Sequence, residues 1–71
     1  MAELSLGERI RQRRLELGHM SLRTLSDITG LSIGHLSAIE NSERKNLQIT
    51  TVKKLAEALE LDIVELLDLH K

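Results

Sequence analysis

Apolar residues recur three or four positions apart through nearly the whole chain, a period typical of helices that bury one face. Serine and glycine residues interrupt this pattern at short intervals, so each helix must be short. We expect five helices, over residues 5–17, 22–29, 33–41, 49–60 and 63–69. Short helices with short connections predict a compact, orthogonal all-α bundle that forms one domain over residues 1–71.

Small polar residues and glycines stand at the expected helix boundaries. Ser5 and Glu8 have the spacing of a capping box, and Gly18 is the expected stop of the first helix. Gly30 is expected to adopt a positive φ that other residues resist. The caps of the second, third and fifth helices are expected to be Ser21, Ser32 and Asp62.

The same spacing assigns residues to the core. In the second helix we expect Leu22, Leu25 and Ile28 to face inward. The apolar positions of the third and fourth helices are Ile33, Leu36, Ile39, Ile49, Val52, Leu55, Ala56 and Leu59.

Composition excludes several kinds of site. Cysteine is absent, so neither a disulfide nor a thiolate zinc site can form. The histidines are scattered, and we expect no metal or cofactor. The lack of aromatic residues excludes the stacking platforms of proteins that bind single-stranded nucleic acid. No apolar run approaches the ~20 residues of a membrane span, and the first residues lack a signal-peptide pattern, so we expect a cytoplasmic protein with no membrane partner.

Charge is unevenly distributed, although the net charge is only −1. Residues 57–68 carry only acidic charges. Basic residues gather in the first helix, at Arg9, Arg11, Arg13 and Arg14. They can be joined in space by Arg23, Arg44 and Lys45. This pattern predicts one basic face and one acidic end, and a basic face is what nucleic acid binding requires.

Residues 21–40 carry the functional argument. Two short helices, each with a serine at its start, meet across Thr29, Gly30 and Leu31. A helix-turn-helix has this arrangement, because the glycine allows a sharp reversal and the surrounding apolar residues fix the angle between the helices. The second helix can then project its outer side into a DNA major groove, which is about 12 Å wide.

Four stretches match a known family: LGERIRQRR at 6–14, TGLS at 29–32, LSAIE at 36–40 and KLAEAL at 54–59. Through them, the segment 6–67 resembles the Cro and phage-repressor helix-turn-helix family, often called the Xre family. The resemblance implies a compact five-helix, lambda-repressor-like DNA-binding domain with its helix-turn-helix at 21–40.

The resemblance also implies roles for single residues. The third helix would be the recognition helix, with the base-facing residues Ile33, Gly34, Ser37 and Ala38. Ser32 matches a capping residue that meets a phosphate, while Arg14 and Glu40 match a structural salt bridge between the first and third helices. Further phosphate contacts would come from Arg9, Arg11, His35, Arg44, Lys45 and Asn46. For His35, an ordinary exposed histidine is the alternative.

Two departures from the family pattern affect these contacts. Leu22 stands where many members have a glutamine that holds a phosphate, so that contact should be missing. The base-facing residues also offer no bidentate hydrogen bond, although Ile33, Gly34 and Ala38 could touch thymine methyls. Ser37 could make one hydrogen bond. Specificity would then depend more on DNA shape, or on arginines from the loop or the helix ends.

The C-terminal helix region 62–69 has more apolar residues than one face of a short helix can bury. Core packing accounts for only part of them, and the rest would form an exposed patch unless a partner covers it. We therefore expect a homodimer with the interface residues Ile63, Leu66, Leu67 and Leu69. A two-fold dimer through this end would place two recognition helices about one DNA turn, ~34 Å, apart.

These observations predict a sequence-specific, double-stranded DNA-binding transcriptional regulator that binds an inverted-repeat operator as a homodimer. It could be a phage or plasmid repressor, a restriction–modification controller, an antitoxin or a fragment of a larger regulator. The alternative is a protein-interaction module whose apolar helix faces bind a regulatory protein. We expect no enzyme: Asp27, His35 and Ser37 could form a triad on paper, but nothing supplies an oxyanion hole.

Overall fold

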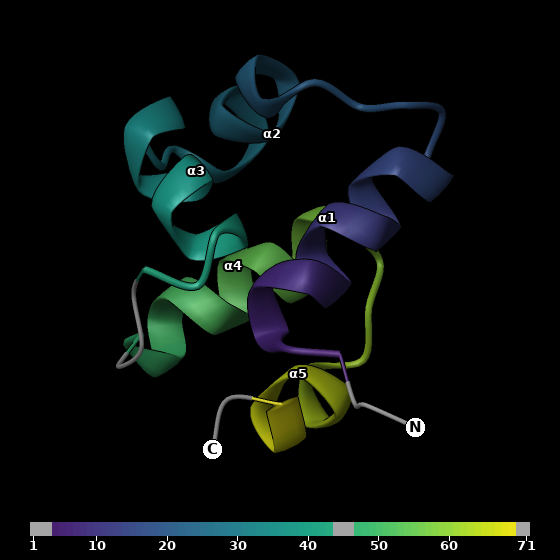
Figure 1. The fold of residues 1–71 in the computed structure, drawn as a ribbon, viewed down its shortest axis with the longest axis vertical. Coiled ribbons are helices and arrows are strands. Elements are labelled where there is room, and N and C mark those ends of the chain that lie inside the picture. Colours follow the sequence, from purple (N-terminus) through teal and green to yellow (C-terminus); the bar gives the residue numbers. More distant parts are fainter. Residues whose placement is uncertain (1–3, 44–46, 70–71) are drawn as a thin grey trace.

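The computed structural model describes residues 4–43 and 47–69, and within them every regular element is a helix. The helices are α1 (Leu6–Glu16), α2 (Leu22–Thr29), α3 (Ile33–Glu40), α4 (Ile49–Ala58) and α5 (Ile63–Leu69). The predicted all-α, five-helix architecture is confirmed. Figure 1 shows α2 and α3 at one end of the long axis and α5 at the other, with α1 and α4 between them.

The capping residues expected from the sequence are in place. Ser5 Oγ accepts from the Glu8 N–H at 3.2 Å, and Glu8 Oε1 accepts from the Ser5 N–H at 3.0 Å. The second bond lowers the pKa of the Glu8 carboxyl, because a backbone N–H stabilises the charged form. Ser21 and Ser32 likewise accept from the backbone of the first turns of α2 and α3. Gly30 has a φ of 78°, as the turn between these helices requires.

The fourth helix is shorter than predicted. It ends at Ala58, because Glu60 adopts a left-handed conformation with a φ of 55°. The Leu61 N–H then donates to the Ala56 carbonyl at 2.9 Å, which closes the helix end. This turn directs the chain back toward α5.

Every helix contributes a fully buried aliphatic side chain to a single core. The completely buried residues include Ile10, Leu25, Leu36, Val52, Leu55, Leu59 and Leu66.

Three predicted core positions, Ile28, Ile33 and Ile49, are exposed instead. Ile28 is 55% exposed, because Thr29 takes the buried position one helical turn after Leu25. The Thr29 hydroxyl donates to the Leu25 carbonyl at 2.8 Å, so its burial leaves no polar group unpaired. Ile49 is 67% exposed. It is the first residue of α4, and side chains slant toward a helix N-terminus, so this one extends past the end of the core.

A close contact between α1 and α3 positions the region that the sequence singled out. Gly7 packs directly on the Ile39 and Glu40 carbonyl groups, and a Cβ there would collide with both oxygens. Beside this contact, Arg14 donates to both carboxylate oxygens of Glu40, from Nε at 2.8 Å and from Nη2 at 3.0 Å. Both side chains are largely buried, so the pair fixes α3 against α1.

Candidate nucleic-acid interface

The outward side of α3 is the surface that the sequence predicted to read DNA. Leu36 and Ile39 are buried, so the residues on the opposite side of the helix face away from the core. The predicted base-facing residues lie on that outward side, with Gly34 exposed, Ile33 45% exposed and Ser37 and Ala38 half-buried. The structure therefore brings the four together on one surface.

Local hydrogen bonds hold α3 at its angle to α2. Ser26 Oγ donates to the Leu31 carbonyl at 2.6 Å, across the turn between the two helices. The Leu31 N–H donates in turn to Thr29 Oγ1 at 3.2 Å. Because both bonds lie within the turn, the direction in which α3 projects is set by residues adjacent to it.

The N-terminus of α3 is open to a phosphate. Ser32 is exposed, and its Oγ accepts from the His35 N–H at 3.1 Å. The amides of Ile33 and Gly34 precede the first helical hydrogen bond, which runs from Leu36 to the Ser32 carbonyl. Together with the helix dipole, such amides favour an anion. His35 is half-buried in the same turn.

Three of the four clustered arginines are engaged within the protein. Arg9 Nε donates to Glu65 of α5 at 2.7 Å, and Arg13 Nε donates to the Leu59 carbonyl at the end of α4 at 2.9 Å. Arg14 binds Glu40 and also donates to the Met20 carbonyl at 2.5 Å. Arg9 therefore points toward the α5 end of the molecule, away from α3, and this placement does not support its predicted phosphate contact.

Arg11 is the member of the cluster that remains exposed and without an ion pair among the described residues. Arg11 follows Gly7 by four residues and precedes Arg14 by three, so it belongs to the side of α1 that contacts the C-terminal end of α3. Its side chain is therefore exposed on the side of α1 that packs against α3.

Two further residues on this side were not assigned to the site from the sequence. Arg23 is exposed and lies one turn before Ser26, on the edge of α2 that meets the turn to α3. Asn41 is exposed at the C-terminal end of α3, and its amide donates to Ser37 Oγ at 3.5 Å. Arg23 was already expected to join the basic face, and helical spacing from Ser37 could have identified Asn41. The predicted contacts Arg44, Lys45 and Asn46 lie outside the described residues.

The α5 end only partly matches the predicted dimer surface. Leu66 is completely buried in the core of its own chain, so its assignment to an interface is wrong. Ile63, Leu67 and Leu69 are partly buried against the same core. Val64 is 62% exposed instead, since it lies on the opposite side of α5 from Leu66. The start of α1 also lies near α5, since Arg9 pairs with Glu65, and Leu4, two residues before α1, is 40% exposed.

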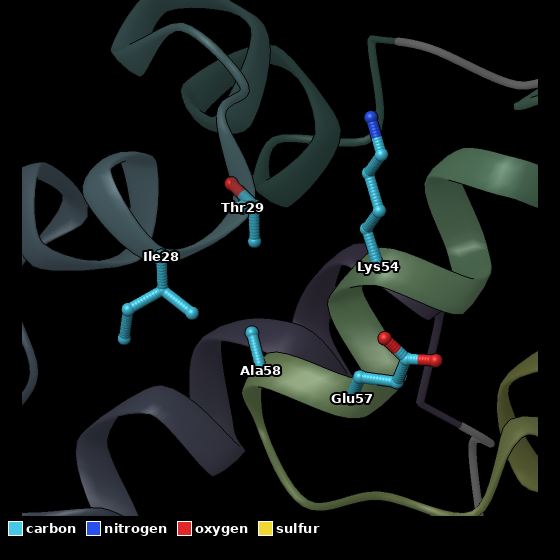
Figure 2. A pocket seen from close by; sticks show the side chains of 5 residues that line it. All are labelled: Ile28, Thr29, Lys54, Glu57 and Ala58. Carbon is cyan, nitrogen blue, oxygen red and sulfur yellow. The ribbon is translucent and has the colours of Figure 1, made fainter.

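A shallow groove of about 330 Å³ lies between α2 and α4. Figure 2 shows Ile28 and Thr29 on one side and Lys54, Glu57 and Ala58 on the other. None of these residues belongs to α3, so the groove is separate from the candidate reading surface.

The described residues contain neither a metal-binding cluster nor a membrane-spanning helix. No group of three or more histidine, cysteine, aspartate or glutamate side chains there could hold a metal ion. Within the same residues, no helix has the length and apolar character needed to cross a membrane.

Comparison with known proteins points in the same direction as this geometry. A family model described as helix-turn-helix matches residues 10–66. One solved structure shows SinR, the master regulator for biofilm formation, in complex with DNA. Its sequence is 35% identical to this chain, and the two structures superpose with a TM-score of 0.81 over 89% of this chain and 98% of that chain. The N-terminal DNA binding domain of SinR from Bacillus subtilis gives 35% identity and a TM-score of 0.80, covering 89% and 90%. No curated protein matches the chain.

Proposed function

Because the chain belongs to the Cro and phage-repressor helix-turn-helix family of DNA-binding transcriptional regulators, we propose that it binds a specific inverted-repeat operator as a homodimer. The operator is double-stranded, and regulation follows from its position at a promoter, as for a repressor or a restriction–modification controller.

The observation that carries this proposal is the outward side of α3. Its residues are exposed or half-buried, and the only carboxylate of the helix, Glu40, is turned inward to Arg14. A helix of this size fits the major groove, where base edges can be distinguished. SinR, 35% identical over most of both chains, has been solved with DNA bound. We therefore assign base contacts to Ile33, Gly34, Ser37 and Ala38.

Phosphate contacts are proposed on both flanks of α3. Ser32 and the amides that follow it present donors at the N-terminal end, with His35 in the same turn. Arg11 flanks the C-terminal end, and Arg23 lies on the adjacent edge of α2. These positions create a local basic surface despite the net charge of −1. The proposal does not use Arg9, since Glu65 already neutralises it.

The homodimer is proposed through the α5 end. Val64 and Leu4 supply exposed apolar surface there, and the partly buried Ile63, Leu67 and Leu69 can extend it. The molecule is 30 Å long, with α3 near the end opposite α5. A two-fold axis at α5 would place the two α3 helices on the outer sides of the dimer, and the proposal requires the subunits to be tilted so that these helices lie one DNA turn, ~34 Å, apart.

A protein-interaction module is the second candidate. It is favoured by the shortage of hydrogen-bonding side chains on the outward side of α3, which presents Ile33 and Ala38. Binding of duplex DNA at low salt separates the two functions, because an interaction module has no requirement for phosphate.

The test is the salt dependence of duplex binding by Arg11→Gln, with Arg9→Gln as the matched control. The variant removes one phosphate contact from each subunit, so in a homodimer it should weaken binding on all sequences and reduce the slope of log K against log salt by about 2. Arg9→Gln should leave this slope unchanged. If the wild-type protein is not retained on random duplex at low salt, or if Arg9→Gln lowers the slope and Arg11→Gln does not, the proposal is wrong.

A further inference from the structure

The outward side of α3 presents small apolar groups to DNA in place of side chains that form hydrogen bonds. Ile33 is the first residue of the helix and exposes nearly half of its surface. Ala38 lies on the same outward side and carries only a methyl group. Ser37 is the one hydroxyl between them, and its oxygen already accepts from Asn41. This surface therefore cannot make the bidentate contacts by which arginine, asparagine or glutamine select a base.

Gly34 lies beside Ile33, and its lack of a side chain has no explanation within the fold. A Cβ at this position would have no neighbouring atom within 4 Å. Its backbone is also helical, so no positive φ requires glycine. Glycine has a lower helix propensity than alanine, so it weakens the first turn of α3. A glycine that weakens the helix without being required by the fold indicates that a binding partner must approach α3 closely at this position.

We propose that α3 reads the C5-methyl group of pyrimidines in the major groove, through Ile33 and Ala38, with Gly34 allowing the close approach. This inference rests on the proposed function and names what its reading surface recognises. In DNA the C5-methyl group is carried by thymine, and by cytosine when that base is methylated at C5. Contact with an aliphatic side chain buries the methyl, and the hydrophobic effect then distinguishes the pyrimidine that carries it.

The experiment begins with a duplex selected by the wild-type protein from a random DNA pool. Each thymine of the selected half-site is then replaced by deoxyuridine, which removes the methyl and keeps the base pair. At the thymines that face Ile33 and Ala38, affinity should fall about fourfold per methyl, the fold-change expected for burying one such group. Replacing those thymines by cytosine, and separately by 5-methylcytosine, shows which base can supply the methyl.

Protein variants assign the effect to α3. Ile33→Ala should bring the thymine-to-uracil affinity ratio close to one at its base, which a double-mutant cycle measures directly. Ile28→Ala is the matched control, since it shortens another exposed isoleucine, on α2, and should leave the ratio unchanged. Gly34→Ala should bind the same duplex at least several-fold more weakly without lowering the unfolding midpoint.

The outcomes separate this inference from the proposed function. If the wild-type protein selects a duplex but every uracil substitution leaves affinity unchanged, the methyl readout is overturned and DNA binding stands. If no duplex is selected at all, the proposed function itself fails. Recovery of affinity with 5-methylcytosine identifies the methyl as sufficient, whereas loss with both uracil and 5-methylcytosine restricts the readout to thymine.

Discussion

At the residue scale, the four arginines between positions 9 and 14 of α1 have different roles, because three of them bind different acceptors and the fourth stays exposed. Arg9 reaches a carboxylate of α5, Arg13 the terminal carbonyl of α4 and Arg14 the carboxylate of Glu40. Arg11 alone of this cluster forms no ion pair within the described residues and stays exposed. A basic run that reads as one DNA-binding feature is therefore mainly a set of contacts between helices.

The Arg14–Glu40 pair gives the sharpest prediction about stability. Glu40→Leu should destabilise the domain by about 3–5 kcal/mol, because it leaves the largely buried Arg14 guanidinium without its carboxylate. Arg14→Met combined with Glu40→Leu should recover much of this loss, since neither charge then remains buried. Urea unfolding of the single and double variants measures both effects. A single variant with a midpoint near that of the wild type would contradict this account.

At the element scale, two glycines in helices have opposite surroundings. Gly7 is enclosed by the carbonyl groups at the end of α3, whereas Gly34 has open space above it. The first glycine is needed for the packing of α1 on α3. The second is not required by the fold, and we therefore assign it a role in the contact with DNA.

Alanine substitutions at these glycines should change stability in opposite directions. Gly7→Ala should destabilise by at least about 1–3 kcal/mol, because its Cβ meets backbone that cannot rotate away. Gly34→Ala should stabilise by about 0.5–1 kcal/mol, through the higher helix propensity of alanine. Thermal unfolding followed by circular dichroism measures both. Equal shifts of the same sign would show that the α1–α3 contact is looser than the structure has it.

The helices and caps were predictable from the sequence because they depend on neighbours a few positions away. The Ser5–Glu8 capping box and the Gly30 turn are examples. The predictions failed at positions where contact with another helix determines which side chain is buried or bound. Ile28 and Thr29 are both compatible with the helical period, and only packing against α4 selects Thr29 for burial. In the same way, the distribution of the arginines among α3, α4 and α5 could not be predicted without the tertiary arrangement.

At the scale of the whole molecule, the proposed dimer predicts a separation of roles between the two ends. Val64→Glu should convert the dimer to a monomer, because it places a charge in the apolar patch at α5. Ile28→Glu introduces the same charge at a similarly exposed isoleucine on α2 and should leave the dimer intact. Sedimentation equilibrium over a range of concentrations gives the mass of each variant. A wild-type protein that remains monomeric at high concentration would end the proposal of a homodimer.

The central claim is that the outward side of α3 enters a duplex groove, and the binding of Ala38→Glu to the selected duplex tests it most directly. A carboxylate here would face base edges and phosphates, so binding measured by fluorescence anisotropy should be abolished while the circular dichroism spectrum stays helical. Ile28→Glu, with the same change in net charge, should bind like the wild type. Wild-type affinity in Ala38→Glu would contradict the placement of α3 as the recognition helix.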